Sequence, residues 1–262
     1  GFASQIADMR GHGESAHGES NLGYFGQGRA AAARRDLQQL VRETREEFPD
    51  IPLILFGHSM GTLVARSYLK RNDREVDAVI LSGSPNQMAG VGVAKTLAKS
   101  MVAVKGDRHV SPALTKMVFA SYVSRFKNEP SSFAWVCGDP EVVRAYDEDP
   151  GCGFPFTLNG YIALFDFLGD VYDAKSWKAV STKLPIWFIS GEEDPCMISL
   201  KKEVESVAIL QKAGYEDVTY RIYPGVRHEI LNDRSKREVY QDVRDKIQGW
   251  IQAKKPGTGD LL

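Results

Sequence analysis

The sequence predicts an α/β protein with a mostly parallel sheet, helices on both faces and one helical insertion. Short apolar runs of strand length alternate with longer amphipathic stretches, which is the pattern of β-α-β units. The alternation breaks between residues 86 and 183, where helical patterns follow one another without a good strand. We therefore expect a core made of residues 1–85 and 184–262, with residues 86–183 as a helical cap over the carboxyl edge of the sheet.

Composition narrows the class of protein. The 262 residues carry a formal charge of −1, from 33 basic and 34 acidic side chains, and no long block of one charge. Nothing therefore favours a nucleic-acid partner, and no apolar run reaches membrane-spanning length. Cys137, Cys152 and Cys196 show no metal-binding spacing. Free thiols in a reducing, cytoplasmic compartment are the simplest interpretation, although a Cys137–Cys152 bridge stays open.

The first predicted elements are a strand at residues 2–9, a Gly-rich loop and an amphipathic helix at residues 27–48. The loop holds the sequence H-G-E-S twice, at 12–15 and 17–20. Two histidines with glutamates between them could suggest a metal site. A polar surface loop with a local duplication is favoured, because nothing fixes the geometry that a metal needs.

A sharp turn follows the next predicted strand, at residues 53–56. The turn is G-H-S-M-G at residues 57–61, and a helix is predicted at residues 62–70. Strand, G-x-S-x-G turn and helix form the context in which Ser59 is held in a strained backbone conformation with its hydroxyl exposed. We expect a Cβ at Gly57 or Gly61 to clash as strand and helix approach. The helix N-terminus would favour negative charge beside the hydroxyl.

The remaining elements follow the same rhythm outside the cap. A buried strand is predicted at 76–82, and the cap helices at 91–104, 113–126 and 156–172, around a polar, Pro-rich stretch at 128–155. The rest of the chain predicts strands at 184–190 and 218–223, helices at 199–213 and 235–253, and a loose tail at 254–262. The cap aromatics either form the cap's own core or line an apolar acyl pocket beneath it.

Three residue types that cooperate in nucleophilic catalysis come directly after three predicted strands. Ser59, Asp194 and His228 follow in that order. A serine hydroxyl needs a base with a pKa near 7, and a histidine base needs an acceptor on its other nitrogen. The neighbouring acids Glu192 and Glu193 compete with Asp194, which we prefer because it lies in the strand-end turn before Pro195. The other histidines, 12, 17, 58 and 109, lie at less suitable positions.

Four motifs together carry a family resemblance. They are D-M-R-G-H-G-E-S at 8–15, G-H-S-M-G at 57–61, G-E-E-D-P at 191–195 and P-G-V-R-H at 224–228. The chain resembles the monoacylglycerol lipase and lysophospholipase branch of the α/β-hydrolases, also grouped as serine aminopeptidases, from residue 2 to about 253, with the cap matching loosely. The serine–acid–histidine order is also the one that α/β-hydrolases use.

The resemblance implies an α/β-hydrolase fold and hydrolysis of lipid-like carboxylic esters. Ser59 would be the nucleophile, Asp194 the acid, His228 the base, and the Met60 backbone N–H one oxyanion donor. It implies no metal and no organic cofactor. The substrate would be a small-molecule or lipid ester, and the cap would supply an acyl pocket and a peripheral, membrane-facing entrance.

One departure from the family pattern bears on the N-terminal part. The family has a strand that ends in a His-Gly loop upstream of the strand that here begins near Phe2, and that loop supplies the second oxyanion donor. Its strand lies between the 2–9 strand and the Ser59 strand. Losing one oxyanion donor costs about a hundredfold or more in rate. We therefore hypothesise that a separate N-terminal segment completes the native fold.

Two alternatives stay open beside the ester hydrolase. The same three residues serve a peptidase or amidase that acts on small substrates, and only a substrate panel separates these activities. A non-catalytic binding protein with this fold is the second alternative. The complete Ser59, Asp194 and His228 set argues against it, whereas the missing strand argues mildly for it.

Overall fold

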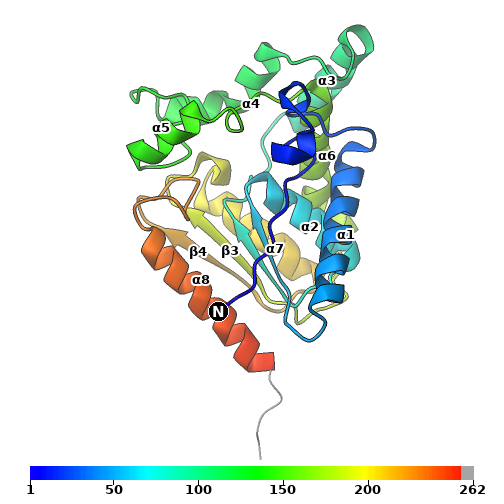
Figure 1. Cartoon of the computed structure of the whole chain (residues 1–262), viewed down its shortest axis with the longest axis vertical. Coiled ribbons are helices and arrows are strands. Elements are labelled where there is room, and N and C mark those ends of the chain that lie inside the picture. The colour runs from blue at the N-terminus through cyan, green and yellow to red at the C-terminus, as the bar shows by residue number, and fades with distance from the viewer. Residues whose placement is uncertain (255–262) are drawn as a thin grey trace, which may run out of the picture.

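The computed structural model describes residues 1–254. A parallel sheet of four strands lies at the centre of this structure (Figure 1). The strands lie in chain order and each neighbouring pair is parallel. They are β1 (Ile54–His58), β2 (Ala78–Ser82), β3 (Ile186–Gly191) and β4 (Val218–Tyr223). The register sets His58 opposite Ser82 and Gly191 opposite Tyr223, so the strands end at one common edge. The predicted α/β class is confirmed.

Eight α-helices accompany the sheet in the described residues. They are α1 (Arg29–Glu47), α2 (Met60–Asn72), α3 (Val91–Lys105), α4 (Pro112–Arg125), α5 (Pro140–Glu148), α6 (Leu158–Tyr172), α7 (Leu200–Ala213) and α8 (Lys236–Lys254). Local chemistry sets several of their ends. Ser111 and Asp139 cap α4 and α5, each followed by proline at the first helical position, and Gly214 ends α7 in the left-handed conformation.

The alternating side chains of β2 show how both faces of the sheet are covered. Val79 and Leu81 belong to the larger core, which α1, α2, α6 and α7 share, whereas Ile80 points to a second core under α8. All three side chains are fully buried. Because both faces of β2 are buried, its sequence is a continuous apolar run rather than an alternation of apolar and polar residues.

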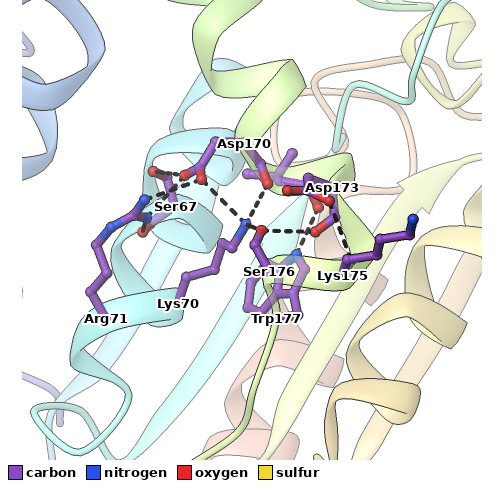
Figure 2. A network of polar contacts seen from close by, with 9 residues as sticks. Ser67, Lys70, Arg71, Asp170, Asp173, Lys175, Ser176 and Trp177 are labelled. Carbon is purple, nitrogen blue, oxygen red and sulfur yellow. Dashed lines mark hydrogen bonds and ion pairs between the residues drawn. The ribbon is translucent and has the colours of Figure 1, made fainter.

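The segment between β2 and β3 contains α3 to α6. Figure 1 shows α3, α4 and α5 beyond the end of the sheet, whereas α6 runs down beside α2. A polar network fixes that contact (Figure 2): the Asp170 carboxylate on α6 accepts hydrogen bonds from Ser67, Lys70 and Arg71 on α2. Lys70 also donates to Ser176 just beyond α6. The helix that follows Ser59 is therefore tied to the last helix before β3.

One expectation about secondary structure was wrong. Residues 2–9 form no strand, and Phe2 and Ile6 are 53% and 92% exposed. A strand exists only where a neighbour completes its hydrogen bonds, and within residues 1–254 this segment pairs with no strand. The stretch 128–155, which the sequence analysis described only as polar and Pro-rich, contains the helix α5. Its apolar side chains Val142, Val143 and Tyr146 all pack in one cluster.

Other features bear on earlier expectations. The three cysteines are free, so Cys137 and Cys152 form no bridge in this structure. Within residues 1–254, no helix combines the length and the apolar character needed to cross a bilayer. The predicted tail at 254–262 lies outside the described residues, apart from Lys254 at the end of α8.

Candidate active site

Ser59 occupies the sharp turn between β1 and α2. Its backbone has φ 52° and ψ −124°, a strained conformation for a residue with a side chain. The turn holds because the Ser59 N–H donates to the Ser82 carbonyl on β2 at 2.9 Å, and Thr62 donates to the Ser59 carbonyl. The strained turn expected at this serine is thus present.

The two glycines of the turn differ. A Cβ on Gly57 would lie 2.8 Å from the Gly61 carbonyl oxygen, which is too close, so glycine is required there. A Cβ on Gly61 would meet nothing within 4 Å. The expectation of a clash at Gly61 was wrong, because the strand approaches the helix through the Gly57 position only.

His228 and Asp194 form a buried pair. Nδ1 of His228 lies 2.9 Å from Oδ2 of Asp194, and the two residues are 3% and 0% exposed. Asp194 follows β3 and His228 follows β4, so their strands bring them to the same edge of the sheet. The second oxygen of Asp194 accepts the Cys196 N–H at 2.8 Å, which fixes the carboxylate's orientation.

The alternative acids point elsewhere. Glu192 is exposed and accepts the Gly225 N–H at 3.1 Å, and Glu193 pairs with Arg227 at 3.6 Å. Neither has a contact with His228. Asp194 is therefore the carboxylate that reaches the histidine.

Three groups pack against the His228 ring. The rings of His58 and Trp135 have centroids 4.8 Å and 5.2 Å from it. Gly83 lies against the same ring: a Cβ there would be 3.0 Å from His228 Nδ1, and its φ is +60°. Sequence reasoning missed Gly83 and Trp135. The one sequence signal for Gly83 is that it directly follows a predicted strand, and Trp135 has no such signal.

Burial and charge set the protonation behaviour of the two histidines. Burial on its own lowers the pKa of His228, but the negative charge of Asp194 raises it, and the net pKa lies well above the ordinary value. Burial, assisted by the nearby His228, lowers the pKa of His58 to about 3. His58 therefore stays neutral beside His228 at ordinary pH.

Ser59 lies at the same edge as the His228–Asp194 pair. Ser59 is half-buried and is followed at once by Met60, the first residue of α2. Among the hydrogen bonds recorded for residues 1–254, none joins Ser59 to His228. The structure thus brings the predicted acid and base into contact, and the roles of Ser59, Met60, Asp194 and His228 stay predictions.

Arg227 fastens the segment 129–138 to the loop that carries His228. Its guanidinium donates to the carbonyl oxygens of Ala134 at 2.6 Å and Cys137 at 3.2 Å, and it forms an ion pair with Glu129. The Glu229 N–H also donates to the Val136 carbonyl at 2.8 Å. These bonds hold Trp135 over His228. Sequence reasoning missed them because they join positions about 90 residues apart.

A second buried network supports the turn after Asp194. The Asn86 side chain donates to the Met197 carbonyl at 3.1 Å and to the Glu203 carboxylate at 3.0 Å, and Ser190 donates to the other Glu203 oxygen. Burial raises the pKa of Glu203 to about 7. The network links the loop after β2, the end of β3 and α7, and so braces Asp194 from behind.

The two H-G-E-S sequences were expected to form a polar surface loop, and only part of this stretch does so. His12 packs among aromatic rings, with centroid distances of 5.8 Å to Phe25, 5.3 Å to Phe154 and 5.5 Å to Phe156. Burial lowers its pKa. His17, by contrast, is exposed in the left-handed conformation. The two repeats therefore differ in environment, and their histidines do not come together.

The cap aromatics divide between two clusters. Tyr161, Phe165 and Phe167 of α6 are buried in the main core. Tyr122 and Trp135 belong to a separate cluster that includes Cys196 and packs against His228. An acyl pocket under the cap stays a prediction.

Comparisons with known proteins agree with the fold described above. A family profile described as serine aminopeptidase, S33, matches residues 1–235. A monoacylglycerol lipase of Mycolicibacterium smegmatis is 29% identical over 237 residues, which cover 86% of this chain and 76% of that protein. The mouse monoglyceride lipase is 25% identical over 218 residues, 83% of this chain and 64% of its own length. A thermostable carboxyl esterase of Bacillus coagulans, solved with glycerol, superposes with a TM-score of 0.86 at 25% identity, covering 93% and 79% of the chains.

Proposed function

The chain belongs to the serine aminopeptidase (S33) family of α/β-hydrolases, and from this we propose that it hydrolyses carboxylic esters of lipid-like substrates, of the monoacylglycerol or lysophospholipid type. The observation that carries the proposal is the 2.9 Å contact between His228 and Asp194 at the sheet edge where the strained Ser59 also lies. Relatives named as monoacylglycerol lipase and carboxyl esterase support the reaction class.

Ser59 is the nucleophile in this mechanism. Its Oγ attacks the ester carbonyl while its proton passes to Nε2 of His228. The Met60 N–H at the start of α2 stabilises the developing oxyanion. Collapse of the tetrahedral intermediate expels the alcohol, which takes the proton from His228. Water then attacks the acyl-enzyme with His228 again as base, and the acid product leaves.

Asp194 prepares His228 for this role. Its Oδ2 accepts the Nδ1–H, which leaves the lone pair of the neutral imidazole on Nε2, where it can accept the serine proton. Its charge also stabilises the imidazolium that forms during attack. Because Asp194 is fully buried and its second oxygen is held by the Cys196 N–H, the carboxylate cannot turn away.

Contact of the cap with lipid surfaces is the finer part of the proposal. The side chains of Val93, Leu97 and Val104 on α3 are 75%, 46% and 83% exposed. Lysines 95, 99 and 105 lie on the same helix. Exposed apolar side chains with interspersed lysines suit a helix at the interface of an anionic bilayer.

The family description also favours a second candidate, hydrolysis of small amides or peptides by the same residues. One experiment separates the candidates. The protein is treated with a fluorophosphonate and weighed by intact mass spectrometry, and then assayed on monoacylglycerol, lysophospholipid and aminoacyl amide substrates.

We expect a single adduct that Ser59→Ala loses, with ester turnover exceeding amide turnover. The Ser59→Ala variant should lower kcat by about 10⁵ or more. Preferential amide turnover would favour the aminopeptidase. No adduct on a folded protein would end the catalytic proposal and leave a binding protein with this fold.

A further inference from the structure

Cys196 lies directly beside the His228–Asp194 pair. It is 3% exposed, and the short turn Pro195–Met197 places it two residues beyond Asp194, whose carboxylate accepts its N–H. One ligand atom from each of Asp194, Cys196 and His228 lies within 4.8 Å of the others. The mechanism above uses the carboxylate and the imidazole but gives the thiol no role.

These three groups form a donor set that suits a thiophilic divalent cation. Thiolate, imidazole and carboxylate are the ligands of Zn²⁺, with bond lengths of about 2.0 to 2.3 Å. In a tetrahedral site, two such ligand atoms lie roughly 3.3 to 3.8 Å apart. The side chains therefore need to shift by up to about an ångström to close around one ion. A thiolate and a carboxylate together also neutralise a dication, which a buried site requires.

We propose that Asp194, Cys196 and His228 form an inhibitory site for Zn²⁺ or a similar thiophilic cation. The cation takes the lone pair of His228 Nδ1, the thiolate sulfur and a carboxylate oxygen, with water as a fourth ligand. The thiol releases its proton to solvent, and the single proton of the neutral imidazole moves from Nδ1 to Nε2.

The move of this proton from Nδ1 to Nε2 would block the proposed reaction. Nε2 then carries a hydrogen and donates, so it can no longer accept the proton of Ser59. The inhibition part of the inference rests on the proposed function, whereas the binding part does not. Binding and inhibition can therefore fail separately.

The other cysteines provide matched controls. Cys137 is also buried and free, but its sulfur accepts the Asp139 N–H, and it does not belong to the metal-competent group found in residues 1–254. Cys196→Ser removes the soft ligand with little change in size. Cys137→Ser makes the same chemical change at a buried site of the same aromatic cluster.

Binding is tested first, on the full chain carrying Ser59→Ala, by titration with Co²⁺ and displacement by Zn²⁺. We expect one ion per chain and a thiolate-to-cobalt charge-transfer band in the near ultraviolet. Adding Cys196→Ser should abolish the band and Cys137→Ser should keep it. A band that survives Cys196→Ser, or no band at all, would overturn the proposal whatever the activity of the enzyme.

Inhibition is tested on the protein with Ser59 intact. We expect Zn²⁺ to inhibit ester hydrolysis and a chelator to restore it. Cys196→Ser, measured against its own metal-free activity, should raise the Zn²⁺ concentration for half inhibition more than about tenfold. Equal sensitivity of both proteins would overturn the inhibitory role. If Cys196→Ser does not fold, Cys196→Ala replaces it, and circular dichroism checks both variants.

Discussion

Arg227 donates a 2.6 Å hydrogen bond to the carbonyl oxygen of Ala134. The residue before His228 therefore holds the residue before Trp135, and the Trp135 ring packs on the His228 ring. The position of the segment 129–138 and the position of His228 are coupled through one guanidinium group.

Arg227→Lys should loosen this coupling. A lysine keeps the charge but replaces the rigid guanidinium fork that contacts Ala134, Cys137 and Glu129 by a single flexible nitrogen. We expect a loss of about 2 kcal/mol in the free energy of unfolding and about a tenfold fall in kcat/KM. Urea unfolding and ester kinetics measure both. The exposed ion pairs of Arg221 provide the control, where Arg221→Lys should cost less than about 1 kcal/mol. Equal losses in the two variants would contradict the coupling.

Asp194→Asn should change both the rate and its pH dependence. The carboxylate raises the pKa of His228 against the opposing effect of burial, so its removal lowers that pKa. We expect the acid limb of the kcat profile to move to lower pH, with kcat reduced by about 10⁴ at the plateau. Glu193→Gln, which alters the neighbouring acid, should leave the profile in place. An unmoved acid limb in Asp194→Asn would show that another group sets the titration.

Glu203→Gln should flatten the pH dependence of stability. Burial raises the folded-state pKa of Glu203 from 4.5 to about 7. As the pH rises, Glu203 loses its proton at a lower pH in the unfolded chain than in the folded protein. The contribution of Glu203 to the free energy of unfolding is therefore complete below about pH 4.5 and is lost as the pH rises to 7. The loss amounts to roughly 3 kcal/mol. Urea unfolding across this range, with Glu205→Gln on the exposed face of α7 as control, measures it. Parallel curves for wild type and Glu203→Gln would refute the assignment.

Alanine at the two turn glycines should have unequal effects. Gly57→Ala forces a methyl group to 2.8 Å from a backbone oxygen, which no rotamer can relieve, and should cost about 1 to 3 kcal/mol or more. Gly61→Ala adds a methyl group in open space within a helix and should change stability by less than about 1 kcal/mol. Thermal unfolding compares them directly. Equal destabilisation would mean that the turn closes more tightly than its backbone indicates.

The residues of the candidate site could be predicted from the sequence because each of them directly follows a predicted strand. Ser59, Asp194 and His228 each follow a buried apolar run, and parallel strands carry such positions to one edge whatever the loops do. The contact between Asp194 and His228 therefore follows from chain order. Gly83, Trp135 and Arg227 could not be found in this way, because their contacts depend on how the segment between β2 and β3 folds back.

The errors of prediction have physical causes as well. Residues 2–9 have an apolar pattern suited to a strand, but a strand also depends on its neighbour, and β1 lies at the edge of the described sheet. The start of α5 is set by the Asp139 cap and by Pro140, which lie inside the stretch described only as polar and Pro-rich. His12 shows that a polar-looking loop can send one ring into an aromatic cluster formed by distant residues.

The strained backbone at Ser59 sets stability against activity in this protein. A glycine at position 59 would relieve a conformational cost of about 1 to 3 kcal/mol and remove the hydroxyl in the same step. Directed evolution for heat resistance alone would thus reward loss of the proposed nucleophile. Libraries built on this scaffold should be screened for turnover and survival together.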